Sequence, residues 1–194
     1  SVSRIDRSFE RRLAALVNGG QKGVQRPVLP PGTLVPIHPV AFLVLTRDEV
    51  YGVPMSPDLN GSTDKTGHLS PDVFGLEPHD LELKVIAPEP RGTDGQVLDM
   101  IGIVTALEGN PLPSGHIASR LGGFDDLKAM EAGGQTNAEL IEAVLGNKNT
   151  LHNNYQDFEK FLTNGGHIGL QHDPLQYGAF ALNPFLVRVE KVPM

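Results

Sequence analysis

Nearly the same eight-residue stretch occurs twice in this chain, and this internal repeat limits the folds that the chain can adopt. Residues 18–25 read NGGQKGVQ, and residues 164–171, 146 positions further on, read NGGHIGLQ. Before each stretch, over residues 8–17 and 155–162, apolar side chains recur at helical spacing. Asn-Gly-Gly then supplies residues that tolerate positive φ, as a helix end and a sharp exit require. Each copy is therefore predicted to begin with a short amphipathic helix that ends at a glycine pair.

The chain that follows each glycine pair also has one pattern. A turn at Leu-Pro-Pro-Gly-Thr (29–33) or at Leu-Gln-Tyr-Gly-Ala (175–179) precedes an apolar run that begins at a proline. These runs, residues 40–45 and 185–189, predict strands, and a proline at the start favours a place at a sheet edge. Each copy is thus predicted to continue as a strand-turn-strand element.

We predict that the two copies superpose over residues 13–45 and 159–189. The glycines in them are assigned to turns and caps, for steric reasons, and to no ligand. They are Gly19, Gly20, Gly32, Gly165, Gly166 and Gly178.

The residues between the copies are more varied. Residues 54–72 are rich in Pro, Gly, Ser and Asp, which is typical of a flexible connection. Residues 79–87 and 100–107 read as strands, and the second is predicted to return as a hairpin toward Leu112. Two further helices are predicted, over residues 125–132 and 137–145.

Short strands and short helices therefore alternate, which predicts an α+β fold built from two related units. We divide the chain into a first unit at residues 1–53, a linker at 54–78 and a second unit at 79–194. Five phenylalanines are predicted to lie in the core, because a chain with eight Phe and no Trp needs those rings inside. They are Phe124, Phe158, Phe161, Phe180 and Phe185, whereas Tyr177, at the second turn, is predicted to be exposed.

Composition argues against several classes of protein. A net charge of −7 disfavours a general nucleic-acid binder, because neutralising phosphates needs a surplus of Lys and Arg. Without cysteine the chain can form neither a disulfide framework nor a cysteine-rich zinc site. No stretch approaches the roughly 20 apolar residues that span a bilayer, so we expect the chain as given to be soluble.

Basic residues gather at the N-terminal end. Residues 1–26 hold six Lys and Arg against two Asp and Glu, a net charge of +4. Such an end suits an anionic lipid surface, and the alternative is the solvated face of a helix. The candidate lipid contacts are Arg4, Arg7, Arg11 and Arg12.

The order of these motifs resembles that of the bacterial flotillin-like branch of the SPFH, or Band 7, superfamily. A Gly-Ile-Val-Thr strand precedes Glu-Gly-Asn-Pro-Leu-Pro-Ser-Gly (108–115), and the second copy of the repeat ends in Leu-Asn-Pro-Phe (182–185). The first copy, with Leu-Pro-Pro-Gly-Thr, looks like the same unit in tandem. The likeness covers residues 9–45 and 98–194.

The resemblance implies a non-catalytic scaffold. SPFH proteins are membrane-associated and assemble into large rings or cages that organise lipids and partner proteins. The expected partners are membrane lipids and other copies of the full-length protein, and the expected location of that protein is the cytoplasmic side of a membrane. Family members usually carry an N-terminal membrane segment and a C-terminal coiled coil, neither of which lies in these 194 residues. We expect the chain to be a fragment that is monomeric or weakly dimeric by itself.

Two alternatives stay open: a soluble binding module of duplicated β units, and an enzyme with an unrecognised site. His167 and His172 have an odd spacing that would place them on opposite faces of an extended segment, which disfavours a metal site. His79-Asp80 and His172-Asp173 are adjacent pairs that cannot orient one another as a catalytic triad does. Glycine-rich residues 121–124 lack the context of a phosphate-binding loop. Four acidic residues could supply paired catalytic carboxylates, but carboxylates on loops and in first helical turns normally serve solubility and the helix dipole. They are Glu77, Asp80, Asp125 and Asp126. No residue is assigned to catalysis, a cofactor or a metal.

Overall fold

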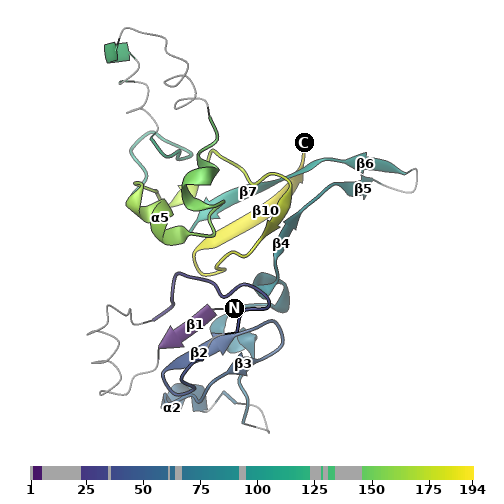
Figure 1. Ribbon diagram of the computed structural model, residues 1–194, viewed down its shortest axis with the longest axis vertical. Helices are drawn as coiled ribbons and strands as arrows, with labels where there is room; N and C mark the ends of the chain where they lie inside the picture. Colours follow the sequence, from purple (N-terminus) through teal and green to yellow (C-terminus); the bar gives the residue numbers. More distant parts are fainter. Residues whose placement is uncertain are drawn as a thin grey trace. The chain divides into compact units, whose positions relative to one another are not determined.

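A computed structural model describes much of the chain, and its short strands and short helices form an α+β fold (Figure 1). The described residues are 2–5, 23–34, 36–60, 62–63, 67–91, 95–122, 128, 131–133 and 146–194. The chain forms two compact units, the first from residues 1–83 with 181–185 and the second from residues 84–180 with 186–194.

Unit 1 is built on an antiparallel sheet of order β1-β2-β3. These strands are Val2–Ile5, Phe42–Leu45 and Val50–Tyr51. A helical turn α2 (Pro57–Asn60) and two 3-10 helices, η1 (Pro71–Phe74) and η2 (Pro78–Leu81), follow them. Strand β2 lies in the middle of this sheet, so the prediction that residues 40–45 form an edge strand was wrong.

Described residues of the segment 54–78 pack into the core of unit 1, which differs from the linker that composition suggested. Buried Leu43, Leu45 and Val50 of the sheet pack with Leu69 and Leu76 from this segment. Partly buried apolar side chains complete the cluster, namely Leu59, Val73, Phe74, Leu81 and Phe185. The first unit therefore extends beyond residue 53, because this segment supplies five of the ten apolar side chains in the cluster, three of them leucines.

Unit 2 is organised around β7 (Met100–Ala106), the strand that the sequence predicted at residues 100–107. It pairs antiparallel with β10 (Val187–Pro193) and, on its other side, with β8 (Gly169–Leu170). The predicted hairpin from β7 to Leu112 was wrong, because both partners of β7 lie in the C-terminal part of the chain. β10 is at the edge of this sheet, as predicted for residues 185–189.

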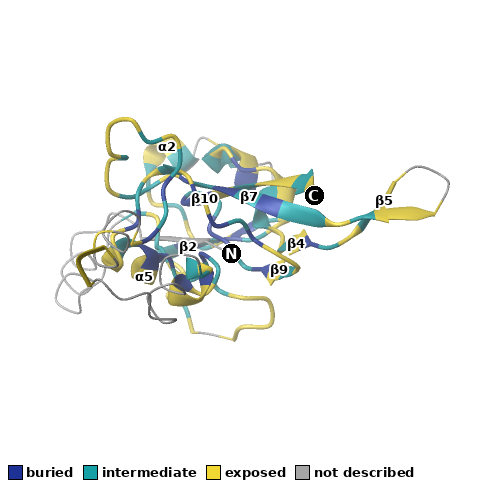
Figure 2. Ribbon diagram, turned by 90° about the horizontal axis from the view of Figure 1, so that it is seen from above, coloured by how far each residue is buried: buried dark blue, intermediate teal, exposed yellow. Residues whose placement is uncertain are grey.

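Two smaller sheets extend unit 2. β4 (Lys84–Ile86) pairs with β9 (Gly178–Phe180), and β5 (Glu89–Arg91) pairs only with β6 (Gln96–Leu98) among the described strands. The strand predicted over residues 79–87 is thus shorter, since η2 occupies its first part. Figure 2 shows the contrast between the exposed β5 and the buried alternate positions of β7.

The helix of the second repeat begins later than predicted. A 3-10 helix η3 (Lys148–His152) is followed by three residues with positive φ, Asn153 to Tyr155, and only then by α5 (Phe158–Thr163). Asp157 caps α5, because its Oδ1 accepts from the Lys160 N–H at 3.2 Å. Predicted helices at residues 8–17, 125–132 and 137–145 lie wholly or largely outside the described residues.

The aromatic predictions hold where the structure describes them. Phe158, Phe161 and Phe180 are buried, and Phe185 packs against the unit 1 cluster. Tyr177 is 80% exposed, as predicted for the second turn. Phe124 lies outside the described residues.

Candidate functional site

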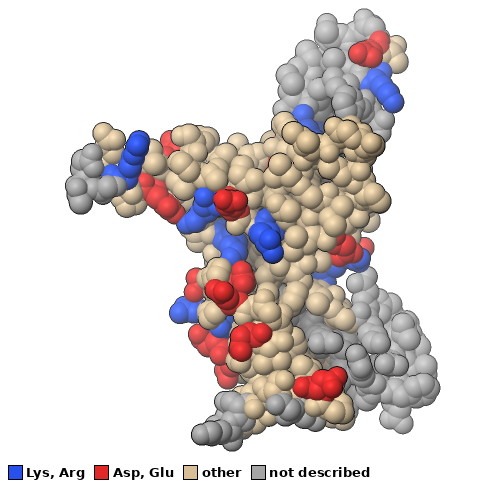
Figure 3. Space-filling model, turned by 180° about the vertical axis from the view of Figure 1, so that it is seen from behind, with Lys and Arg blue, Asp and Glu red and all other residues tan. Residues whose placement is uncertain are grey.

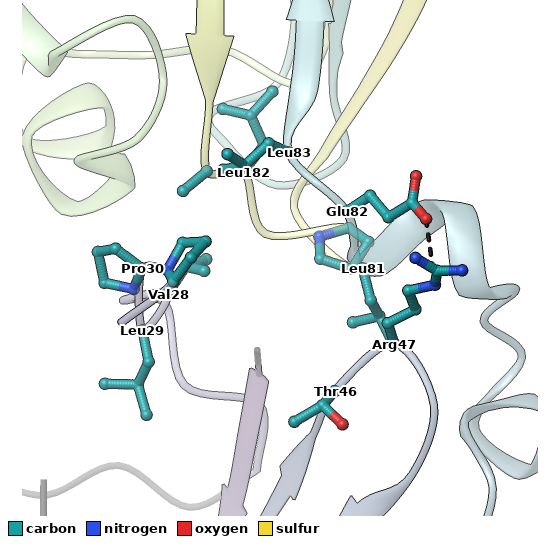
Figure 4. Close-up of a pocket in the computed structure, with 12 residues that line it drawn as sticks. Val28, Leu29, Pro30, Thr46, Arg47, Leu81, Glu82, Leu83 and Leu182 are labelled. Atoms are coloured by element: carbon teal, nitrogen blue, oxygen red, sulfur yellow. Dashed lines mark ion pairs between the residues drawn. The ribbon is translucent and has the colours of Figure 1, made fainter. Parts of the chain in front are cut away.

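Unit 1 contains an open pocket of about 220 Å³ (Figure 4). Four short segments of the chain meet there: the proline-rich stretch after residue 27, the turn after β2, the residues after η2, and residues 181–184. The lining residues are Val28, Leu29, Pro30, Pro31, Thr46, Arg47, Leu81, Glu82, Leu83, Ala181, Leu182 and Pro184. Prolines and branched side chains give this pocket rigid walls, since they have few rotamers to lose.

Asn183 fixes the two most distant of these segments to each other. Its Nδ2 donates to the backbone carbonyls of Gln25, at 2.8 Å, and Arg26, at 3.2 Å. Its Oδ1 accepts from the Phe185 N–H at 3.0 Å. Asn183 is 3% exposed, so all of these bonds are shielded from water and both sides of the amide are used.

The charged groups at the pocket neutralise one another. Arg47 Nε lies 3.2 Å from Glu82 Oε1 and 3.5 Å from Asp48 Oδ1, and all three side chains are largely exposed. Exposed pairs of this kind add little stability. The pocket therefore presents a surface that is about equally polar and apolar, beside the exposed ion pairs of Arg47.

A buried polar cluster in unit 2 holds the residues with the most perturbed pKa values. Burial lowers the pKa of His152 to about 4, and burial also raises the pKa of Tyr155. The Tyr155 hydroxyl donates to the Asp173 carbonyl at 3.0 Å. Arg120 Nε lies 3.5 Å from the Asp173 carboxylate, and the Arg120 guanidinium also donates to the Gly146 carbonyl. These groups tie the loops around α5 to one another.

Ser119 and His167 form a contact that sequence reasoning did not single out. Ser119 Oγ lies 3.0 Å from His167 Nδ1, the spacing of a nucleophile and its base. Ser119 is only 5% exposed, and its backbone bonds to the Leu170 carbonyl and the His172 N–H. The contact therefore links a loop to the second repeat. The two residues are 48 positions apart, so no local sequence pattern could predict their contact.

His167 and His172, which the sequence predicted not to share a metal ion, contact different side chains. His167 meets Ser119, whereas His172 Nδ1 lies 3.5 Å from Asp173 Oδ1. Glu77 and Asp80 form the reciprocal caps of η2, and Asp125 and Asp126 lie outside the described residues. Within the described part of the chain, no group of three His, Asp or Glu side chains is placed to hold a metal ion.

The repeat glycines occupy distinct conformations. Gly32 has φ 80° in the turn after Pro30 and Pro31, and Gly165 has φ 84° just after α5. Gly166 is buried, and a Cβ there would lie 2.5 Å from the Phe161 ring. Gly178 begins β9, whereas Gly19 and Gly20 lie outside the described residues, as does the comparison of the two Asn-Gly-Gly segments.

Of the candidate lipid contacts, Arg4 lies in β1 and pairs with Leu43, whereas Arg7, Arg11 and Arg12 lie outside the described residues. On the face that Figure 3 shows, acidic and basic side chains of the described residues are interspersed. Among those residues, no helix has both the length and the apolar character needed to cross a bilayer.

Comparisons with models of protein families, with curated proteins and with solved structures find no match for this chain.

Proposed function

We propose that this chain is a flotillin-like SPFH segment, part of a non-catalytic scaffold that associates with the cytoplasmic side of a membrane and organises lipids or partner proteins. The class rests on the motif order described above. Its partners are membrane lipids and further copies of the full-length protein.

One observation carries this proposal: two of the sequence motifs on which the resemblance depends lie together in unit 1. Leu29, Pro30 and Pro31 of Leu-Pro-Pro-Gly-Thr line the same pocket as Leu182 and Pro184 of Leu-Asn-Pro-Phe. The two motifs lie about 150 positions apart in the sequence and meet in one compact unit. Their shared pocket supports the view that both motifs belong to one structural element, as the resemblance implies.

Strand pairing supports the idea that the two units are related. In unit 1, β1 precedes the first repeat copy and pairs antiparallel with β2, the last strand of that copy. In unit 2, β7 precedes the second copy and pairs antiparallel with β10, which begins within the end of that copy. Each repeat is thus enclosed by a strand pair of the same sense, as expected of a duplicated element.

Vesicle binding tests the membrane part of the proposal. The chain is mixed with vesicles that contain phosphatidylserine and with neutral vesicles, and binding is measured by co-sedimentation. Arg7→Glu combined with Arg11→Glu should weaken binding to the anionic vesicles roughly tenfold or more, because each basic residue contributes about 1 kcal/mol at such a surface.

The matched control variant carries Arg91→Glu and Lys128→Glu, two exposed positions outside the N-terminal end. It changes the net charge by the same amount. It should bind nearly as the unaltered chain does. Equal losses in the two variants would reduce the effect to net charge and remove the N-terminal lipid contact from the proposal.

A soluble binding module is the second candidate, and the pocket of unit 1 favours it. A chain that ignores both kinds of vesicle but binds a small apolar probe at this pocket would belong to that class. Leu182→Trp, which fills the pocket from one wall, should abolish such probe binding.

A further inference from the structure

The outer edge of β10 carries unpaired main-chain groups in a fixed alternation. The N–H of Leu107 donates to the Leu186 carbonyl, and the N–H of Met194 donates to the Asp99 carbonyl, both at 2.8 Å. In an antiparallel pair, residues that bond to the neighbour alternate with residues whose groups point away. Even-numbered residues of β10 therefore bond to β7. The N–H and C=O groups of Val189 and Lys191 point outward.

Nothing among the described residues pairs with that edge. β10 ends the sheet order β10-β7-β8, and no main-chain hydrogen bond joins Val189 or Lys191 to another segment of the described chain. Figure 1 shows β10 beside β7 in this sheet. Pro193 also fits an edge, because its missing N–H falls at an outward position.

The two charges on the solvent face of β10 have no ionic partner in the described part of the chain. Arg188 and Glu190 are both exposed, and they lie two positions apart on one face of the strand. Their neighbours across β7 are Thr105 and Ile103, which carry no charge. A cation and an anion two positions apart are complementary to the same two charges on a second copy of β10 that runs antiparallel to the first.

Unit 1 shows a strand in the corresponding place. There β3 pairs antiparallel with Val44 and Leu45, the last two residues of β2. Counted from Pro39 and Pro184, which begin the two apolar runs, Val44 corresponds to Val189. The outer edge of β10 therefore corresponds to the edge of β2 that pairs with β3 in unit 1.

We propose that β10 pairs with β10 of a second copy of this chain, antiparallel, about a two-fold axis at Val189. The outward N–H and C=O of Val189 then bond to those of Val189 in the other copy. Arg188 of each copy lies opposite Glu190 of the other, in the closer type of antiparallel pair, where opposite charges stabilise the sheet.

Charge selects this register over its neighbours. An axis at position 188 would oppose two arginines, and an axis at 190 would oppose two glutamates. An axis at 191 would oppose two lysines, each of which already pairs with Glu89 of its own chain. Like charges directly opposite one another destabilise a strand pair. Only the axis at Val189 gives both copies a complementary partner.

The paired segment is short. Val187 is 3% exposed, which limits access on one side, and Pro193 has no N–H to donate on the other. The contact is therefore far smaller than the roughly 1,200 Å² of a stable interface. It is a weak contact that becomes populated where many copies are held together. In that respect it rests on the proposed scaffold function.

Charge swaps test the pairing directly. Sedimentation equilibrium up to millimolar concentration should show a weak dimer of the unaltered chain. Arg188→Glu alone, and Glu190→Arg alone, should each weaken dimerisation about tenfold, because each creates two like-charge oppositions. A mixture of the two variants should form a mixed dimer of nearly the original affinity, since their charges are again complementary.

Recovery in the mixture also shows that both variants are folded. A strictly monomeric unaltered chain, or single variants that dimerise as well as it does, would overturn the proposal. Dimers of both single variants that fail to exchange on mixing would do the same. The vesicle experiment changes Arg7 and Arg11, whereas the dimerisation experiment changes Arg188 and Glu190. Failure to dimerise would therefore not contradict the membrane proposal, and failure to bind vesicles would not contradict the strand pairing.

Discussion

The backbone N–H of Tyr155 donates to Nδ1 of His152 at 2.8 Å, so this ring nitrogen is an acceptor in the folded protein. Three consecutive residues with positive φ, Asn153, Asn154 and Tyr155, bring that N–H back to the ring, with φ of 47°, 55° and 63°. Non-glycine residues rarely adopt this region, and a run of three is unusual. His152, at 1% exposure, is thus held neutral inside a tightly turned loop.

Acid should destabilise unit 2 through His152. Burial lowers its pKa from 6.5 to about 4, so the unfolded chain binds more protons between these values. The full contribution to stability is therefore present well above pH 6.5, and it falls by about 1.4 kcal/mol per pH unit between pH 6.5 and 4, a loss of about 3 kcal/mol in all. Urea unfolding at several pH values measures this loss.

A His152→Gln variant should lose this dependence on pH, whatever its own stability. His172→Gln, at an exposed position, should keep it. A parallel pH dependence in the His152 variant would assign the acid sensitivity to other groups.

Tyr155→Phe should destabilise unit 2 by about 1–2 kcal/mol, because the buried Asp173 carbonyl loses the hydroxyl that donates to it. Tyr177→Phe, at a ring 80% exposed, should change stability by less than about 0.5 kcal/mol. Thermal unfolding of the two variants compares them, and equal effects would contradict the role given to the Tyr155 hydroxyl.

Gly166→Ala should cost about 1–3 kcal/mol, because the new Cβ would meet the Phe161 ring at 2.5 Å in a packed core. Adding Phe161→Leu should offset part of that cost, so the double variant should be more stable than the sum of the single changes predicts. Vesicle binding per folded molecule should stay unchanged. Loss of binding without loss of stability would give Gly166 a contact role that we have not assigned.

Asn183→Ala should loosen unit 1 by about 3 kcal/mol, since two buried carbonyls and the Phe185 N–H lose their partner. Hydrogen exchange of the β2 and β3 amides should report this loss. Gln25→Ala is the matched control, because the Gln25 carbonyl that Asn183 bonds is retained. Equal exchange rates in both variants would show that the amide does not hold the pocket segments together.

Sequence patterns were informative where structure is local and failed where partners are distant. The alternation of residues 100–107 is a property of one strand, and β7 forms there. Its pairing with β10 joins residues more than 80 positions apart, and no turn signal encodes such a contact. A hairpin to Leu112 was the nearest local solution and was wrong.

The candidate pocket shows the same limit. Its turn at residues 29–33 could be read from Pro and Gly alone. The second turn was predicted at residues 175–179, whereas the structure also turns at residues 184–186. Asn183 itself could not be singled out, because its acceptors are main-chain carbonyls 157 and 158 positions away, and every residue has such a carbonyl. Residues 54–78 were misjudged because polar and glycine-rich composition outweighed three well-spaced leucines.

The assignment of residues 181–185 to unit 1 has a consequence for how the protein is made. Strands β9 and β10, on either side of this segment, belong to unit 2, so unit 1 is completed by Asn183 and Phe185, which are translated only after residues 84–180. Domains usually fold in the order in which they leave the ribosome. Here unit 1 stays incomplete, with its apolar cluster partly open, until residues 181–185 have been made. A ribosome stalled at residue 170 would therefore carry a chain in which neither unit has finished folding.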